Sequence, residues 1–284
     1  MQPKDPKDPY ADYTEQDLLD FLKSFKATRE RNAQYEYSNI GFGLLGYVLT
    51  RAAKAQSFET LLATRILTPL GMNSTTSDAK KFTARLAQPH DANGQPTPAW
   101  VLPIAHAGAG AIRSTVGDMG RYVEAIAGIK TGEPDHAIAL ALTTREQGPG
   151  RINPIGLAWM KIPFANREFF NHDGDTFGSS SSMLVDRTTK EGVIVLANSS
   201  TKLTDIAIHL MDRRHNLAPR VFPAIVPVAE ALLTRYAGNY KLNEQMNVAI
   251  RVIGSKITAQ ATGRASLKIF RKVKRDFLPK SRRS

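Results

Sequence analysis

Cysteine is absent from this 284-residue sequence, and so is any long hydrophobic run. Without cysteine, disulfides, thiolate catalysis and thiolate metal sites are excluded, although the cellular compartment stays open. No apolar stretch approaches about 18 residues, so no transmembrane helix is predicted. Residues 1–9 are polar and rich in proline, and they lack the apolar core of a signal peptide. We interpret them as a solvated lead-in or as a start point inside a longer protein.

Positive charge is in excess, and most of it lies near the C-terminus. The net charge is +12, and residues 264–284 carry nine Lys or Arg against one acid, Asp276, so they supply eight of these charges. A basic tail can bind nucleic acid or an anionic surface. The sequence has no helix-turn-helix, zinc-finger spacing or basic sheet with interleaved aromatics. We therefore expect a solvated terminus and no nucleic-acid partner.

Helical periodicity runs through the first half of the chain. Thr14, Ser57 and Ser114 each precede an amphipathic segment, so we expect them to be helix N-caps. A further helix is predicted over residues 134–142. Residues 107–111 contain only alanine and glycine, and we expect a flexible stretch there.

The pattern changes to strands after Gly150. Four strands are predicted by runs of apolar residues between turn signals, over residues 155–162, 168–172, 180–185 and 193–197. Residues 203–211 return to helical spacing. Helices first, then an antiparallel sheet with a closing helix, indicate an α+β fold.

The last quarter of the chain has a different character. Residues 219–227 contain three prolines and are typical of a linker. A short helix over 228–236, a turn at Gly238-Asn239-Tyr240 and strands over 247–253 and 256–261 follow. Two or three strands are too few to close a barrel. We predict four parts: a domain over 1–218, a linker over 219–227, a small β appendage over 228–263, and a basic tail over 264–284.

Two short motifs carry most of the chemical information. Tyr37-Ser38-Asn39 stands directly before an amphipathic helix, and His172-Asp173-Gly174 lies in a strand-like stretch. Taken singly, Tyr37 fits a partly buried tyrosine beside an N-cap, and His172 fits an ordinary strand histidine. The other histidines show no i,i+4 pairing, and Asp173 and Asp175 do not complete a calcium loop, so no metal site is predicted.

Together with their surroundings these motifs resemble the class C β-lactamase family of penicillin-binding serine hydrolases. That family also includes D-Ala-D-Ala carboxypeptidases, D-aminopeptidases and esterases. The matching stretches are, in order, 37–46, 66–72, 113–119 and 172–178 with the hairpin strand 192–198. The resemblance implies a β-lactamase/DD-peptidase-like fold, no cofactor, and a small amide, peptide or ester substrate. Its members are mostly periplasmic or secreted, and it leaves the oligomeric state open. Residues 233–262 also resemble the start of a lipocalin-like domain.

The resemblance implies a role for each motif residue. Tyr37 would be the base or proton relay, and Asn39 would hydrogen-bond the substrate amide. His172 stands where many members have lysine, and it would act as a cation or as a neutral donor. Gly174 and Asp175 would bind substrate, and the Asp175 backbone N–H would stabilise an oxyanion.

The nucleophile is missing from its expected place. The family carries it in Ser-x-x-Lys at a helix start, before the tyrosine motif. The sequence contains this tetrapeptide only at Ser77–Lys80 and Ser199–Lys202, both after Tyr37. We interpret both as chance matches. We expect an N-terminally truncated form that lacks the nucleophile helix and the first strands of the sheet.

Two functional hypotheses follow, and the sequence leaves open whether this chain is an enzyme. The first is a serine hydrolase that forms an acyl-serine intermediate. Because Asp173 and Asp175 would repel the carboxylate of a penicillin, a peptidase or esterase is favoured over a true β-lactamase. The second is a catalytically inactive remnant that serves as a binding or structural module.

Overall fold

The computed structural model describes residues 4–5, 8–30, 36–143, 146–147, 154–218, 229–243, 246–253, 256–261 and 267–269. Internal contacts divide the chain into two compact units, one over residues 3–217 and one beginning at Ala218. The first contains a six-stranded sheet and the second a four-stranded sheet. No helix within the described ranges is both long and apolar enough to cross a membrane.

Helices make up most of the first half of the larger unit. They are α1 (Glu15–Ser24), α2 (Asn39–Ala52), α3 (Phe58–Leu62), the π-helix η1 (Ala63–Leu67), α4 (Thr68–Leu70), the 3-10 helix η2 (Thr83–Arg85), α5 (Ala107–Gly110), α6 (Val116–Ile126) and α7 (Asp135–Leu142). Two of the expected N-caps are confirmed: Thr14 forms a capping box with Asp17, and Ser57 accepts from the N–H of Thr60. The third is wrong by one residue, because Thr115 caps α6.

Six antiparallel strands pair in sequence order. They are β1 (Glu146–Gln147), β2 (Pro154–Ile155), β3 (Met160–Phe164), β4 (Arg167–Asp175), β5 (Ser180–Asp186) and β6 (Glu191–Ala197). The single strand expected over 155–162 is wrong. Gly156 donates to the Trp159 carbonyl at 2.8 Å, and Ala158 has a φ of 70°, so a turn separates β2 from β3.

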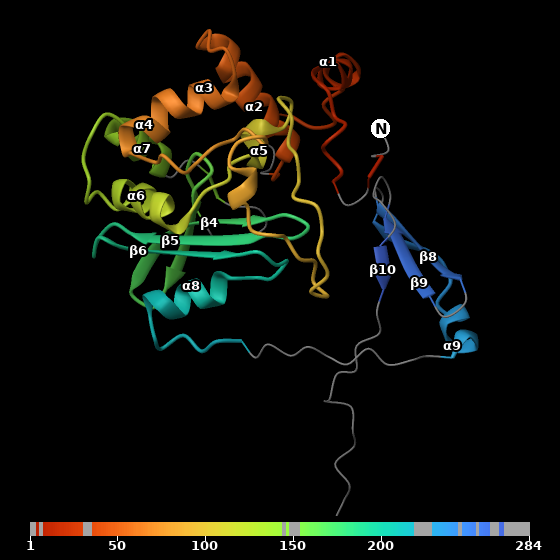
Figure 1. The fold of residues 1–284 in the computed structure, drawn as a ribbon. Coiled ribbons are helices and arrows are strands. Elements are labelled where there is room, and N and C mark those ends of the chain that lie inside the picture. The colour runs from red at the N-terminus through yellow and green to blue at the C-terminus, as the bar shows by residue number, and fades with distance from the viewer. Residues whose placement is uncertain are drawn as a thin grey trace, which may run out of the picture. The chain divides into compact units, whose positions relative to one another are not determined.

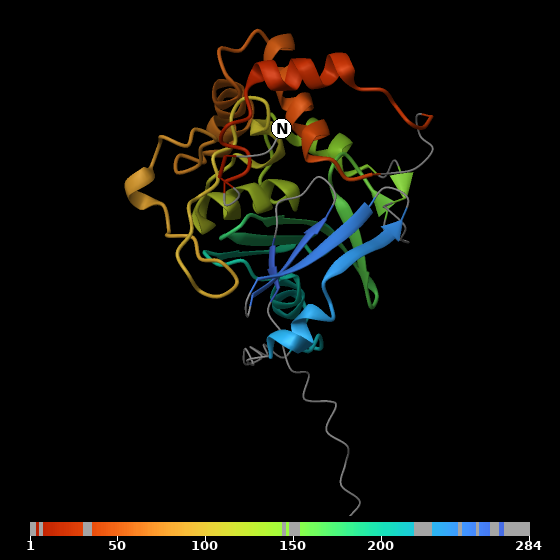
Figure 2. The same cartoon turned by 90° about the vertical axis from the view of Figure 1, so that its right-hand side faces the viewer.

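Helices lie on both faces of the six-stranded sheet (Figures 1 and 2). Alternation along β5 sends Met183 and Val185 into a core with helices that include α6 and α7. Leu184 points the other way, into a second core with Ala207 of α8 (Thr204–Met211). The α+β prediction of a helical region, an antiparallel sheet and a closing helix is confirmed.

Helix α2 lies unusually close to α5, the segment that we expected to be flexible. A Cβ added at Gly46 would stand 2.8 Å from the Gly108 Cα, and one added at Gly108 would stand 2.5 Å from the Phe42 carbonyl oxygen. Only glycine permits backbones to approach in this way. The small residues of 107–111 therefore form a helix packed on α2, and the expected flexible stretch is wrong.

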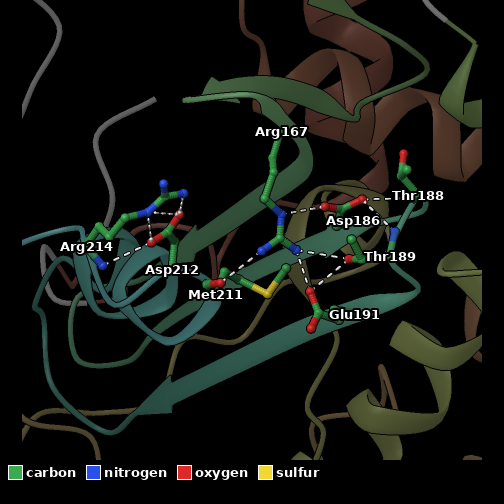
Figure 3. A network of polar contacts seen from close by, with 8 residues as sticks. All are labelled: Arg167, Asp186, Thr188, Thr189, Glu191, Met211, Asp212 and Arg214. Carbon is green, nitrogen blue, oxygen red and sulfur yellow. Dashed lines mark hydrogen bonds and ion pairs between the residues drawn. The ribbon is translucent and has the colours of Figure 1, made fainter.

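A charged network on β4 joins the sheet to the end of α8 (Figure 3). Arg167 Nε donates to Asp186 Oδ2 at 2.7 Å, and another of its nitrogens donates to the Met211 carbonyl at 3.0 Å. Arg167 of β4 also forms an ion pair with Glu191 of β6, the strand that follows β5 in the sheet. The Asp186 side chain is only 3% exposed. One guanidinium thus bridges three elements of the fold.

The smaller unit pairs its strands in the order β10-β9-β8-β7. It contains α9 (Glu230–Thr234), β7 (Gly238–Asn243), β8 (Met246–Ile253), β9 (Lys256–Ala261) and β10 (Leu267–Ile269). The expected turn at 238–240 is wrong, because these residues belong to β7 and pair with β8. The predicted linker 219–227 and residues 270–284 of the tail lie outside the described residues. The four-part domain layout and its lipocalin-like interpretation remain predictions.

Candidate active site

Tyr37 and Asn39 stand at the exposed head of α2. Ser38 is the N-cap, and its hydroxyl accepts from the Gly41 N–H at 3.0 Å. This bond orients the first turn and leaves the residues on either side free to face outward. Tyr37 is 54% exposed. Within the described part of the chain, neither the Tyr37 nor the Asn39 side chain has a hydrogen-bond partner, so both are available to a ligand.

The second motif is split between the two faces of β4. Because side chains alternate along a strand, His172 and Gly174 share the face of Phe170, which packs against the helical core. Asp173 faces the side of α8, where it accepts from Ser182 Oγ and Thr204 Oγ1, both at 2.6 Å. Its carboxylate therefore also has a structural role, because it joins β4 to β5 and α8.

An open cavity of about 270 Å³ lies at the end of β4. Gly174 and Asp175 are the two predicted site residues that line it; Tyr37, Asn39 and His172 do not. No hydrogen bond or ion pair among the described residues joins the α2 head to β4. The lining residues are Asp173, Gly174, Asp175, Ser181, Thr201, Lys202, Leu203 and Thr204.

Asp175 is one of two carboxylates that line this cavity, together with Asp173. Partial burial raises the pKa of Asp175, whereas the Ser180 hydroxyl and the charge of Lys202 act to lower it. The cavity thus combines the carboxylate of Asp175 and the ammonium group of Lys202 within a small space. A ligand that offers both an ammonium and an acceptor group complements this lining.

Sequence reasoning missed Ser181. Ser181 lies opposite Gly174 in the β4–β5 register, and its Oγ is 2.5 Å from the position of an added Gly174 Cβ. Any side chain at residue 174 would therefore displace the Ser181 hydroxyl. The register of the β4–β5 hairpin would have revealed this pairing, but hydrophobic patterning does not specify register to one residue within a run of four serines.

Neither Ser-x-x-Lys serine begins a helix. Ser77 lies in a bend, where its hydroxyl and its backbone N–H both donate to Glu59 Oε2, at 2.8 and 2.6 Å. Ser199 forms an isolated bridge with His90, and its carbonyl accepts from Ser180 Oγ at 2.8 Å. Both serines serve local structure here, in agreement with our interpretation of the tetrapeptides as chance matches.

Glu59 is the carboxylate on which the Ser77 bend depends. Partial burial acts to raise its pKa, but hydrogen bonds from Lys81, Ser77 and Thr76 outweigh burial and lower the pKa of Glu59 to about 2. A carboxylate with a depressed pKa stabilises the fold above its unfolded pKa, and this contribution is lost as the pH falls through the folded value.

Glu59→Gln should therefore lower the free energy of unfolding by about 1–3 kcal/mol at pH 7, because the amide cannot accept all of these donors. Urea unfolding would measure the loss. The difference from the unmodified chain should shrink as the pH falls from 4.5 towards 2. Glu124→Gln, at an exposed glutamate of α6, is the matched control and should change little. An equal loss in both variants would contradict the role given to Glu59.

A metal centre finds no support in the described residues, where no group of three or more His, Asp or Glu side chains is placed to hold an ion.

The family model for beta-lactamase matches residues 1–215. The chain belongs to the beta-lactamase family. The order of the four motif stretches, the helical region and the antiparallel sheet all agree with this membership. The resemblance and the fold predicted from sequence are therefore confirmed.

Solved structures of this family share the fold at low sequence identity. The chain is 19% identical to a beta-lactamase/D-alanine carboxypeptidase from Pseudomonas syringae, with a TM-score of 0.64 over 72% of this chain and 66% of that one. It is 20% identical to the D-alanine carboxypeptidase AmpC from Burkholderia cenocepacia, with a TM-score of 0.64 over 73% and 69%. An octameric penicillin-binding protein homologue from Pyrococcus abyssi matches at 21% identity and a TM-score of 0.62, over 90% and 60%. The chain thus spans about two thirds of the length of these structures.

Proposed function

We propose that this chain carries the substrate-facing part of a serine-hydrolase site of the class C type. The observation that carries the proposal is the exposed pair Tyr37 and Asn39 at the N-terminal end of a capped helix, where neither side chain has a hydrogen-bond partner among the described residues. An accessible phenol at this place suits a base or proton relay, and an accessible amide suits a hydrogen bond to the substrate. His172, on the face of β4 that looks toward the helices, supplies a cation or a neutral donor.

The cavity beside β4 supports a substrate class. We infer an amide, peptide or ester that presents an amine or a neutral group near Asp175, because a carboxylate there would meet like charge. Asp173 also lines this cavity, and neutral hydroxyl donors do not cancel the charge of a carboxylate, so Asp173 and Asp175 both contribute to the repulsion, which Lys202 weakens. A peptidase or esterase therefore remains favoured over a true β-lactamase.

The second candidate is a catalytically inactive module, and a specific observation favours it. The family reaction begins with a serine in Ser-x-x-Lys, and the two serines of this kind lie outside helices, with Ser77 held by Glu59. The acylation step thus requires a Ser-x-x-Lys segment different from these two.

Covalent labelling tests both candidates. The chain by itself should show no adduct with a fluorophosphonate or with penicillin on prolonged incubation, as read by mass spectrometry. Joined to the Ser-x-x-Lys segment of a D-alanine carboxypeptidase of this fold, it should become labelled at that serine. Tyr37→Phe should then slow labelling by about 10²–10⁴-fold, the usual contribution of general base catalysis.

The outcomes separate the two candidates. An inert joined protein with an intact fold would favour the inactive module. Labelling of the chain by itself at Ser77 or Ser199 would overturn our interpretation of these serines. Hydrolysis of a cephalosporin by the joined protein faster than of an amino-acid amide or a simple ester would overturn the proposed substrate class.

A further inference from the structure

His106 is a buried histidine that the proposed chemistry does not use. It is 5% exposed and stands immediately before α5. Its ring lies between two tyrosines, with centroid distances of 4.9 Å to Tyr10 and 4.7 Å to Tyr13. Its Nδ1 atom is buried without a hydrogen-bond partner in the part of the chain that the structure describes. Such an atom is costly to leave unsatisfied, so this position is poorly suited to a charged ring.

The two tyrosines belong to residues 8–14, the segment before α1, here called the strap. The Tyr10 ring also contacts Trp100 at 5.2 Å, and the Asp8 carboxylate accepts from the Val101 N–H at 3.1 Å. Helix α1 follows directly, and its Leu18 is fully buried in a cluster with Tyr47 of α2. The strap therefore packs on the His106 ring through Tyr10 and Tyr13.

Among the described residues, no ion pair is in place to stabilise a protonated His106. Charged groups reach this region from the strap, α1, α2 and the segment after α5, yet none of those that the structure describes forms an ion pair with the imidazole. Asp8 is bonded to Val101, Asp17 to Thr14, Glu15 to Arg51, and Arg113 to the Trp100 carbonyl. Burial lowers the pKa of His106.

We propose that the strap and α1 form an acid-sensitive latch, which His106 releases when it takes up a proton. A histidine with a depressed folded pKa stabilises the closed form above its ordinary value near 6.5, and the stabilisation is lost as the pH falls below that value. Release of the strap uncovers Ile40 and Leu44, which pack against this cluster in the first turns of α2. The latch thus controls the stretch of helix that follows Tyr37.

Asp8 acts in the opposite sense. Burial raises the pKa of Asp8 from its ordinary value of 3.8, so protonation of Asp8 favours the closed strap at lower pH. The effect of His106 is separated from that of Asp8 in two ways: measurements are made at pH 5.5 and above, and the Asp8→Asn variant, which lacks the carboxylate, is included.

Hydrogen exchange of the full chain, read by mass spectrometry, tests the latch. Protection factors of peptides within residues 8–24, corrected for the intrinsic exchange rate, should fall between pH 7.5 and pH 5.5. The limit is about tenfold, which is reached when the open form binds one proton with a pKa near 6.5 and the closed form binds none. Peptides of β4 and β5 should keep their protection. The same fall is expected in Asp8→Asn and in His136→Gln, which alters an exposed histidine of α7.

His106→Phe and His106→Gln should each abolish the pH dependence, the first with the stacking kept and the second without it. Unchanged protection of residues 8–24 in the unmodified chain would overturn the latch. An equal fall in both His106 variants would do the same, as would a simultaneous loss in β4 and β5, which would indicate unfolding of the whole unit.

Discussion

Arg167→Ala is expected to lower the free energy of unfolding by about 2–4 kcal/mol at pH 7. Removing one partner of a buried ion pair leaves the other charge uncompensated, which for fully buried pairs costs about 3–5 kcal/mol. We place the value somewhat lower because the Arg167 side chain keeps 19% of its exposure, while Asp186 keeps only 3%. Urea denaturation followed by circular dichroism measures the change.

The pH dependence of this loss identifies its cause. Burial acts to raise the pKa of Asp186, but Arg167 and the N–H groups of Thr189 and Thr188 outweigh it and hold this pKa below its ordinary value of 3.8. Stability from Asp186 is thus present above that pH and is lost as the pH falls further. The difference between Arg167→Ala and the unmodified chain should therefore shrink below about pH 4.

Figure 3 also contains the matched control. Arg214 pairs with Asp212 two residues away, and the Arg214 side chain is 72% exposed. The Asp212 side chain is 8% exposed, but most of the Arg214 side chain lies in solvent, which screens the pair, and this long side chain loses entropy on pairing. Arg214→Ala should therefore have a much smaller effect than Arg167→Ala. Equal losses in the two variants would contradict the bridging role of Arg167.

Gly108→Ala is expected to lower the free energy of unfolding by about 1–3 kcal/mol, the usual cost of overpacking. The new Cβ would meet the Phe42 carbonyl oxygen at 2.5 Å and the Gly46 Cα at 2.9 Å, and neither backbone atom can rotate away. Thermal and urea unfolding should both report the loss. Since α2 must shift, the position of Tyr37 at its head should change as well.

Gly120→Ala serves as the control for this substitution. Gly120 lies within α6, and an added Cβ there has no atom within 4 Å. Alanine in an open helical position stabilises a helix by about 0.5–1 kcal/mol relative to glycine. The two glycines should therefore respond with opposite signs. A stabilising effect at both positions would show that α2 and α5 do not need their close contact.

Local signals explain which elements could be predicted. Thr14 and Ser57 were recognisable as caps, because a hydroxyl before an apolar helical run satisfies N–H groups of the first turn, which lie within four residues. The strands β4, β5 and β6 were recognisable from apolar runs between turn signals. The break between β2 and β3 could not be recognised, because Ala158 adopts a positive φ, which an alanine in the sequence does not indicate.

Glycine-rich residues 107–111 show the limit of composition as a guide. Small residues predict flexibility when nothing packs against them and close helix contact when something does. The sequence holds both possibilities, and the presence of α2 beside α5 selects the second.

The candidate site was predictable only as a set of residue types. Tyr37, Asn39, His172, Gly174 and Asp175 were identified from two motifs and their order along the chain, and their roles remain proposals. The motifs could not reveal on which face of β4 each side chain lies. Asp173 lies on the face of α8, while His172 lies on the opposite face, with the helical core. Ser181 and Lys202 were not predicted as site residues, because they reach the cavity from other parts of the chain.

By itself, the amino-acid sequence determined the family, the α+β order of elements and the absence of a Ser-x-x-Lys motif before Tyr37. These properties depend on residue types and spacings, which are local. The tertiary structure decided which carboxylates accept hydrogen bonds, which serines are held, and that His106 Nδ1 is buried without a partner among the described residues. Each of these depends on contacts between residues far apart in sequence, such as Glu59 with Ser77 or Tyr10 with His106, and no local pattern encodes them.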